Sequence, residues 1–576
     1  MSVHLNSSTT VAVIGLGAQG LVAVKNMLEE GYNVTGFDRN DYIGGIWHYC
    51  AEQRISVLPS TVVNVSRERA CFTDFPFPEG TDSYPTASQI DRYLNSYADH
   101  FNLRHHLRLS TMIQSVKRDD VKAKWVLQIQ PTGGRQPAEP QEFDKLIVAV
   151  GPHSTPVIPN LEGKEDFKGQ ILHSIAFKDP SSFNAKRVMV VGIGNTAADT
   201  ATALVSHASS VFLAHRHGAA VLPRILQNGT SLDHSASYRT FGIKDTLDVY
   251  TPALSRGFVD YWTLKIIESE WGPYDPQWRL TPIPNFVHQV PTVSDTLIPA
   301  LRAGKIKSVA VPKRVLGLNT VELEDGTTED VDAIVYCTGY HPNFSFLGTH
   351  DPTVLHTTAG PQPDLLASLE AKPSALYATP ILYQNIFSLT HADSLAFVGL
   401  ALISFPAFLT SDLASMAVAQ LWSCSPRSPT LPPTSEMYVW FQNHLQWSNS
   451  IRASSLTGRF PHLTVQNGPW LTWVQKVVGT ELDEHLSLFS LKAWRFWISD
   501  RRFCGLLMNK IYSPHFYRLF DSNGRRKSWS GARVAIETVN EDVRRRLKEK
   551  RKKAGVVEDK SPIMVKVMPV DVVVAA

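Results

Sequence analysis

The sequence predicts an α/β fold with two Rossmann-like dinucleotide-binding domains, followed by a mostly helical C-terminal extension. Two glycine-rich turns carry this prediction, one at residues 15–20 and one at residues 192–197. Each turn follows four apolar residues in an expected strand, 11–14 or 188–191, and opens a stretch with helical spacing. In that order a glycine backbone can approach a pyrophosphate at a helix N-terminus. Two such turns in one chain predict two bound nucleotides.

The strand after the first turn indicates which ribose that turn serves. Residues 33–37 end at Asp38, whose carboxylate can accept hydrogen bonds from ribose hydroxyls but would repel a 2′-phosphate. This favours FAD or NAD. The glycine pair at 44–45 follows soon after and would let the backbone pass close to a flavin ring, which favours FAD. The residues expected to bind FAD here are Gly15, Gly17, Ala18, Gln19, Gly20, Asp38, Arg39, Gly45, Ile46 and Trp47.

The strand after the second turn ends differently. Residues 210–214 lead into His215-Arg216-His217, where no acid is available. Arg216 offers a fork of N–H donors suited to phosphate, and Arg224 would add a second positive charge, so this site suits NADPH. The alternative, that Asp38 and Arg216 are ordinary solvated charges, stays open. The residues expected to bind NADPH are Gly192, Gly194, Asn195, Thr196, Ala197, Arg216 and Arg224.

A third segment, at 334–340, completes the expected flavin site. It is a short apolar strand that ends in Thr338-Gly339. We expect this strand to return to the first sheet and to bring a glycine backbone close to the flavin. An ordinary buried strand or turn is the alternative.

The domain boundaries follow from these landmarks. We expect the first part of the FAD-binding domain at 1–165, with a hairpin strand at 115–130, and the NADPH-binding domain at 166–325. An aromatic, less regular insertion at about 227–291 could cover the active site. Residues 326–425 would return to the FAD-binding domain. The proline-rich stretch 426–433 then opens a helical extension at 426–576 with a basic tail.

Composition excludes several classes of protein. The net charge of +3 is too small to indicate nucleic-acid binding. The polar N-terminus resembles no secretion signal, so a reducing, cytoplasmic location is expected. No Cys-x-x-Cys spacing is present, which argues against a metal site, a disulfide scaffold or a redox-active disulfide. The five cysteines are Cys50, Cys71, Cys337, Cys424 and Cys504.

No segment is predicted to cross a membrane. The apolar stretch 395–409 contains Gly399 and Pro406 and is shorter than the ~20 residues that a span needs. We interpret it as a buried strand plus loop. The basic run 544–553 is typical of a solvated helix or tail, with weak contact to an anionic membrane or another protein as the alternative. An oligomer is possible.

The segment 167–177 points to a family. It reads Phe-Lys-Gly-Gln-Ile-Leu-His-Ser-Ile-Ala-Phe, which fits the pattern Phe-x-Gly-x-x-x-His-x-x-x-(Tyr/Phe). With the two glycine turns in order, the chain resembles the flavin-containing monooxygenases from about 10 to 425. Residues 72–78, 325–327 and 338–340 match further family motifs, with a weaker echo at 517–519 and 529–533. Two departures are Asp38, where many members have Glu, and Ala197 in place of Gly.

The resemblance implies an FAD-dependent, NADPH-consuming monooxygenase. Such enzymes transfer one oxygen atom of dioxygen, from a flavin hydroperoxide, to a nucleophilic N or S, or an activated C, of a small organic substrate. The resemblance also implies that Asn64, next to Val63 and beside the flavin, supports the flavin peroxide and the NADP⁺ that stays bound. His173, the other candidate catalytic residue, is expected to organise the linker between domains more than to transfer a proton. A loop-capping role for Asn64 stays open.

Three other functions are alternatives. A Baeyer–Villiger monooxygenase acting on a ketone is the nearest alternative, although Phe177 stands where those enzymes usually have Trp. A disulfide reductase would need a redox-active cysteine pair, which the cysteine spacing denies. A non-catalytic interaction protein that kept the fold would use the aromatic, basic C-terminal region. The substrate cannot be read from the sequence, although the aromatic insertion suggests specialised metabolism.

Overall fold

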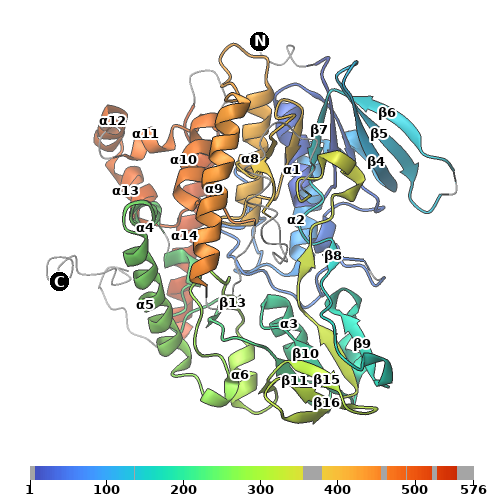
Figure 1. The fold of residues 1–576 in the computed structure, drawn as a ribbon. Helices are drawn as coiled ribbons and strands as arrows, with labels where there is room; N and C mark the ends of the chain where they lie inside the picture. The colour runs from blue at the N-terminus through green and yellow to red at the C-terminus, as the bar shows by residue number, and fades with distance from the viewer. Residues whose placement is uncertain are drawn as a thin grey trace.

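The computed structural model describes residues 7–52, 54–134, 136–235, 237–354, 379–455, 463–487, 490–521 and 528–553. Two units built on parallel strands lie one above the other in Figure 1, and helices of the C-terminal part cover one side of the upper unit. The predicted α/β class, with two dinucleotide-binding domains and a helical C-terminal extension, is confirmed.

The upper unit is a seven-stranded sheet in which β1 occupies a central place. Its strand order is β20 (Leu382–Tyr383), β21 (Phe387–Ser388), β22 (Leu395–Phe397), β7 (Lys145–Val148), β1 (Thr10–Ile14), β2 (Asn33–Phe37) and β3 (Leu107–Arg108). The strand β1 pairs in parallel with β2 and β7, and its last residue, Ile14, lies opposite Phe37 and Val148. The turn after β1 therefore emerges at the carboxyl edge of the sheet, where parallel sheets bind ligands.

Helix α1 (Ala18–Glu29) begins at that turn and packs against α8 (Ala407–Trp422). A fully buried carboxylate, Asp412 on α8, links three segments. It accepts hydrogen bonds from Asn26 Nδ2 at 2.8 Å and from the amide and hydroxyl of Thr73 at 2.9 and 2.8 Å. The stretch 395–409, predicted as a buried strand plus loop, forms β22, a loop and the start of α8.

An antiparallel sheet extends the upper unit. It contains β4 (Thr111–Asp119), β5 (Lys124–Pro131) and β6 (Glu139–Phe143). The hairpin predicted at 115–130 is therefore present, with Val116 opposite Leu127. Helix α2 (Ala87–His100) precedes this sheet in the chain.

The lower unit is a five-stranded parallel sheet. Its order is β14 (Lys307–Val309), β11 (Ser210–Ala214), β10 (Arg187–Val191), β18 (Ala333–Tyr336) and β9 (Gln170–His173). Helix α3 (Asn195–Leu204) follows β10 through the second glycine turn. The smaller elements are β12 (Val221–Leu222) paired with β13 (Thr292–Val293), helix α6 (Leu297–Arg302), and the sheet of β15 (Pro312–Val315), β16 (Thr320–Leu323) and β17 (Thr328–Asp330).

The prediction that the strand at 334–337 returns to the first sheet was wrong. Strand β18 lies in the lower sheet between β10 and β9, with Ile334 opposite Met189 and Ile171. A buried run of apolar residues has the same pattern in either sheet, so the sequence could not assign it. The chain returns to the upper unit only after β18, where β19 (Tyr340–His341) pairs antiparallel with β8 (Thr155–Pro156). The two chain segments that connect the units, one containing β8 and the other β19, thus run side by side.

The insertion at 227–291 is more regular than predicted. It contains two helices, α4 (Tyr238–Tyr250) and α5 (Pro252–Trp271). A capping box begins α4, in which Ser237 and Thr240 bond each other's backbone amides. The helix α4 contacts α10 and α13 of the C-terminal extension, so the insertion joins that extension to the lower unit.

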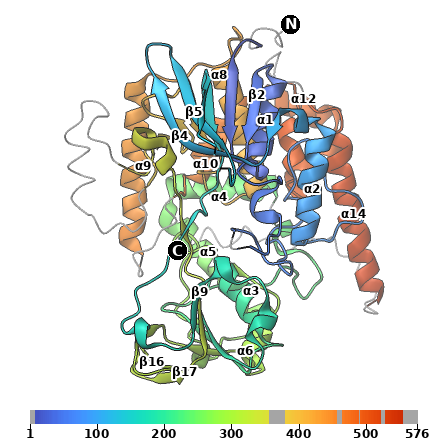
Figure 2. The same cartoon turned by 90° about the vertical axis from the view of Figure 1, so that its right-hand side faces the viewer.

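The C-terminal extension is helical, as predicted. Its helices are α9 (Thr434–Ser454), α10 (Asn467–Val478), α11 (Leu482–Leu486), α12 (Leu491–Ser499), α13 (Arg501–Asn509) and α14 (Ala532–Lys553). Figure 2 shows α14 as a long helix at one side of the molecule. Among the described residues, no helix is both long and apolar enough to cross a membrane. The tail beyond 553 lies outside the described residues.

Candidate active site

The first glycine turn has no room for side chains at two positions. Gly15 has φ +95°, and a Cβ there would lie 2.6 Å from the carbonyl oxygen of Ala149. A Cβ on Gly20 would lie 1.7 Å from the carbonyl oxygen of Gly15. Strand, turn and helix therefore meet at backbone contact distance, which only glycine allows.

The middle glycine of this turn is less crowded. A Cβ on Gly17 would find its nearest neighbour, Gly45 Cα, at 3.6 Å. Gly17 is also the N-cap of α1, and no side chain caps the helix. The first N–H groups of α1 are thus available to an anion, and the predicted glycine pair 44–45 lies against Gly17 beside them. This arrangement fits a pyrophosphate.

The remaining residues predicted for the first site gather around this turn. Asp38 accepts hydrogen bonds from the amides of Leu16 at 2.7 Å and Asn40 at 2.8 Å. Burial raises the pKa of its carboxyl, against the effect of these two amides. Gln19 packs against Gly399. The rings of Trp47 and Phe408 meet edge to face, with 6.5 Å between their centroids. Arg39 is exposed, and Ile46 is half-buried.

The second turn repeats the first in outline. Gly192 has φ +135°, and a Cβ there would lie 2.6 Å from the carbonyl oxygen of Cys337, whereas Gly194 has no neighbour within 4 Å. Gly194 begins α3 without a side-chain cap. The Asn195 side chain accepts from the Val293 amide at 2.8 Å and so does not cap the helix. Thr196 is exposed, and Ala197 is fully buried behind the turn.

The two arginines predicted to bind phosphate have different surroundings. Arg216 follows β11 and is half-exposed, with its Nε 3.4 Å from Glu324 Oε1. Arg224 is 7% exposed and its three nitrogens all donate to protein oxygens: Nε to Val63 O, Nη1 to Asp295, and Nη2 to Val62 O and Asn64 Oδ1. The structure therefore gives Arg224 a structural role, and the prediction that it serves a phosphate is not supported.

The contact with Arg224 fixes the amide of Asn64. The guanidinium can only donate, so the Asn64 atom 2.9 Å from Nη2 is the oxygen. The Nδ2 group has no acceptor among the described residues, which leaves it free to donate to a bound molecule. Val63, beside it, is buried. This geometry is consistent with the role predicted for Asn64, which stays a prediction.

The segment 44–64 connects the two glycine turns. Its glycine pair lies over Gly17, and near its other end the Thr61 hydroxyl lies 3.4 Å from Asp199 Oδ2 on α3. Burial raises the pKa of Asp199 to about 6, against the influence of Arg224 and Thr61. The beginnings of α1 and α3 are therefore joined through one short segment that ends at Asn64.

His173 lies at the crossing between units. Its Nε2 is 3.1 Å from the Gly339 carbonyl, which can only accept, so Nε2 carries the proton. Its Nδ1 accepts from the Ile175 amide at 3.3 Å. Burial lowers the pKa of His173, which favours this neutral form. Both nitrogens are thus occupied by backbone groups, an arrangement suited to the predicted linker role. Thr338 donates its hydroxyl to the Val157 carbonyl in the same crossing.

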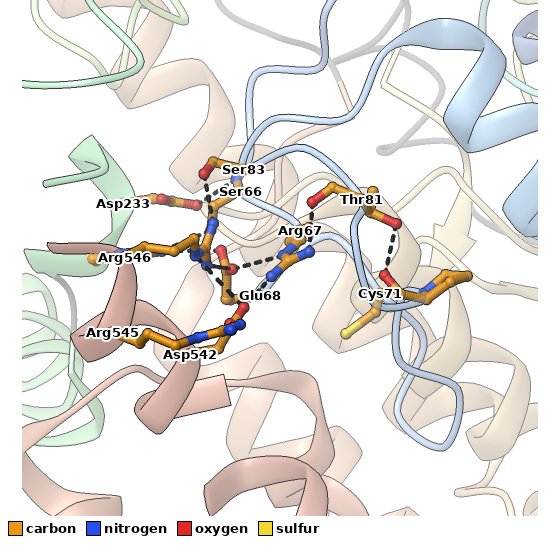
Figure 3. Close-up of polar contacts among 12 residues, drawn as sticks. Ser66, Arg67, Glu68, Cys71, Thr81, Ser83, Asp233, Asp542, Arg545 and Arg546 are labelled. Atoms are coloured by element: carbon orange, nitrogen blue, oxygen red, sulfur yellow. Dashed lines mark hydrogen bonds and ion pairs between the residues drawn. The ribbon is translucent and has the colours of Figure 1, made fainter. Parts of the chain in front are cut away.

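Several residues around Asn64 were missed by sequence reasoning. The Ser66 amide donates to Asp233 at 2.8 Å, and Glu68 lies 3.2 Å from His234. Figure 3 shows that Arg546, from α14, also reaches Glu68. These partners lie more than 160 positions apart in the chain, so no local spacing could reveal them. All five cysteines are free.

The sequence is similar to that of a known family and to those of several curated proteins. The model of the flavin-binding monooxygenase-like family matches residues 8–358. Monooxygenase aurF of Gibberella zeae is 42% identical over 534 residues, covering 92% of this chain and 98% of that protein. A dimethylaniline monooxygenase (N-oxide-forming) of Rattus norvegicus is 35% identical over 346 residues, covering 58% of this chain and 62% of the rat protein.

Solved structures share the fold. The S-allyl-L-cysteine S-oxygenase of Allium sativum has a TM-score of 0.58 at 18% identity, covering 94% of this chain and 98% of that one. Cyclohexanone monooxygenase of Rhodococcus sp. Phi1, bound to NADP⁺, has a TM-score of 0.57 at 19% identity, covering 82% of this chain and 97% of that one. The first of these proteins is named for oxidation at sulfur and the second for a ketone. The shared fold therefore does not determine which of the two reactions a protein catalyses.

Proposed function

This chain belongs to the flavin-binding monooxygenase-like family and is a monooxygenase, and from this premise we propose the reaction that it performs. It uses FAD and NADPH to insert one oxygen atom of dioxygen into a small organic substrate, at a nucleophilic nitrogen or sulfur. The observation that carries the proposal is the pair of uncapped helix N-termini, at Gly17 and Gly194, joined by the segment that ends at Asn64.

The residues of the first turn fit FAD. The backbone at 15–20 and the N–H groups of α1 would hold its pyrophosphate, with Gly45 lying over them and Asp38 oriented at the end of β2 for a ribose. When bound, FAD would supply the activation of dioxygen. Asn64 would donate its free N–H group toward the cofactors, and Arg224 would keep that amide in orientation.

The residues of the second turn fit NADPH. The N–H groups of α3 would hold the second pyrophosphate, and Arg216 stands directly after β11, where the sequence places no acid next to it. Glu324 pairs with Arg216 at 3.4 Å and is itself half-exposed, so a 2′-phosphate could replace it as the partner. The NADP⁺-bound relative of the same fold is consistent with this cofactor.

We favour oxygen transfer to nitrogen or sulfur over ketone oxidation as the reaction of this enzyme. The rat relative is named for N-oxide formation, and it is far more similar in sequence than cyclohexanone monooxygenase is. Phe177, at the last position of the fingerprint, is consistent with this choice. The insertion and the aromatic C-terminal helices are consistent with a specialised substrate.

Product analysis with three probes tests the proposal. The protein, NADPH and air are incubated with thioanisole, N,N-dimethylaniline or cyclohexanone, and the products are identified by mass spectrometry. We expect a sulfoxide or an N-oxide that carries one atom from ¹⁸O₂. A lactone from cyclohexanone without either product would favour the Baeyer–Villiger alternative. A purified protein without flavin and without any product would favour a non-catalytic interaction protein.

A further inference from the structure

The loop after Asn64 carries an almost completely buried carboxylate. Glu68 is 3% exposed, and an ionised group at such a site is costly unless donors or cations surround it. Its Oε1 accepts from Arg67 Nε at 3.0 Å and from Arg546, and its Oε2 lies 3.2 Å from His234 Nε2. Burial would raise the pKa of Glu68, but His234, Arg546 and Arg67 bring it to about 2. Glu68 is therefore ionised at neutral pH.

The partners of Glu68 come from three separate parts of the chain, and Figure 3 shows two of them, Arg67 and Arg546. Arg67 belongs to the loop itself, His234 to the insertion, and Arg546 to helix α14. The helix makes two further contacts with the same loop, because Arg546 donates to the Ser83 hydroxyl and Asp542 pairs with Arg67. The basic run 544–553 is predicted to be a solvated helix or tail, but Arg546 in this run is thus bound to the loop of the upper unit.

The same loop holds Asn64 four residues earlier. Arg224 binds the Asn64 oxygen, and Asp233 accepts from the Ser66 amide. The Ser66 hydroxyl lies 3.2 Å from His234, the residue that also faces Glu68. The segment 64–68 is therefore attached at one end by Arg224 and at the other by Glu68, with Ser66 between them.

We propose that Glu68 is a positioning residue for Asn64. Through Arg546 and His234 it attaches the loop to α14 and to the insertion, and the C-terminal helix thereby becomes part of the support of the active site. This inference rests on the proposed function, because the orientation of Asn64 affects catalysis only if Asn64 serves the cofactors.

Hydrogen exchange of the full-length protein tests the attachment directly. Arg546→Met keeps much of the side-chain stem and removes the charge, so amides in 62–70 should exchange at least about tenfold faster. Arg544→Met is the matched control, because Arg544 is exposed on the same helix and shows no hydrogen bond or ion pair with the described residues. Unchanged exchange in 62–70 for Arg546→Met would overturn the proposal. Glu68→Gln makes the same test if it folds, and Arg546→Met suffices if it does not.

A double-mutant cycle tests the link to Asn64. The rate of NADPH-dependent hydrogen peroxide release is measured without substrate for Asn64→Ala, Arg546→Met and the double variant. If α14 acts through Asn64, Arg546→Met raises the rate by a factor of about three or more alone, and adds little in the Asn64→Ala background. The KM for NADPH should stay unchanged, and Arg546→Lys should restore part of the wild-type rate.

Two outcomes separate failure of the inference from failure of the proposed function. If the effects of Asn64→Ala and Arg546→Met multiply, the residues act independently and the positioning role is wrong. If the wild-type protein holds no flavin and releases no peroxide with NADPH, the proposed function is wrong. In that second case the exchange rates in 62–70 still show whether α14 holds the loop.

Discussion

At the scale of single residues, the two glycine turns divide their positions between packing and binding. Gly15, Gly20 and Gly192 are required by backbone contacts, since a Cβ at each would lie within 2.6 Å of a carbonyl oxygen. A Cβ on Gly17 would make only an ordinary contact with Gly45, and one on Gly194 would have no neighbour within 4 Å; each of these glycines begins a helix without a side-chain cap. Substitutions at the two kinds of glycine should therefore have different consequences.

Gly17→Val should remove FAD and keep the fold. The added side chain would occupy the space over the first N–H groups of α1, where a pyrophosphate must approach. The flavin absorbance of the purified protein and its thermal melt are measured together, with Gly317→Val, a substitution at an open position in the lower unit, as the control. Full flavin content in Gly17→Val would show that the pyrophosphate does not lie at this turn.

Arg216→Ala should weaken the binding of NADPH and leave that of NADH nearly unchanged. A charge-assisted contact to the 2′-phosphate contributes about 1.5–3 kcal/mol, which corresponds to roughly a tenfold or greater rise in Kd. Titration calorimetry with both nucleotides makes the measurement. Arg314→Ala, which removes another exposed arginine paired with a glutamate, is the control. Equal loss for both nucleotides would refute the phosphate role.

Asp199→Asn should stabilise the protein above about pH 6 and have little effect near pH 4. The folded-state pKa of about 6 exceeds the ordinary value of 3.8, so folding favours the protonated carboxyl, and stability is lost as the pH rises between these values. The penalty that Asn removes amounts to up to about 3 kcal/mol. Urea unfolding at several pH values measures it.

Asp332→Asn should change the stability of the protein in the opposite direction to Asp199→Asn. Hydrogen bonds from Arg187 lower the pKa of Asp332 to about 2, against the effect of its partial burial. Its ionised form therefore stabilises the fold above about pH 4, and this variant should lose stability in the same range where Asp199→Asn gains it. The same sign of change for both variants would contradict the assignments.

At the scale of elements, the C-terminal extension is fixed to the first dinucleotide-binding unit by buried charges. Asp74 pairs with Lys25 of α1 and with Arg518, and these three side chains are no more than 5% exposed. Arg518 and Lys25 also pair with Glu29, at 3.0 and 2.9 Å. The weak family echo at 517–519 is therefore the place where the extension contacts α1.

Asp74→Asn should destabilise the protein strongly. Loss of this carboxylate leaves two buried cations with the partly exposed Glu29 in place of their buried partner, at a cost of up to about 3–5 kcal/mol. Asp99→Asn is the control, because its pair with Arg104 is largely exposed and contributes little. Denaturant unfolding followed by tryptophan fluorescence compares the two. A similar small loss in both variants would show that the buried cluster does not hold the extension.

Elements with a local signal could be predicted, and those that depend on distant partners could not. The strand, turn and helix at each glycine motif follow from adjacent residues. The sheet to which β18 belongs depends on pairing with β10 and β9, and both sheets accept the same apolar run. Likewise Arg224 reads as a free cation in the sequence, but the fold surrounds it with oxygens from 62–64 and Asp295.

At the scale of the whole molecule, four parts of the described chain meet at the loop that holds Asn64. The first unit contributes the loop, the second unit contributes Arg224, the insertion contributes Asp233 and His234, and the extension contributes Arg546. An enzyme that must keep two cofactors in one orientation needs such support from all sides. Helix α14 of the extension thus contacts this loop directly.

Anaerobic reduction of the flavin tests the central claim most directly, namely that FAD and NADPH bind side by side at the two turns. The purified protein is mixed without oxygen with NADPH or with NADH, and the flavin absorbance is followed by stopped flow. We expect NADPH to bleach the flavin band much faster than NADH, and dioxygen to restore it. A protein that carries no flavin, or a flavin band that NADPH leaves unchanged, would contradict the account.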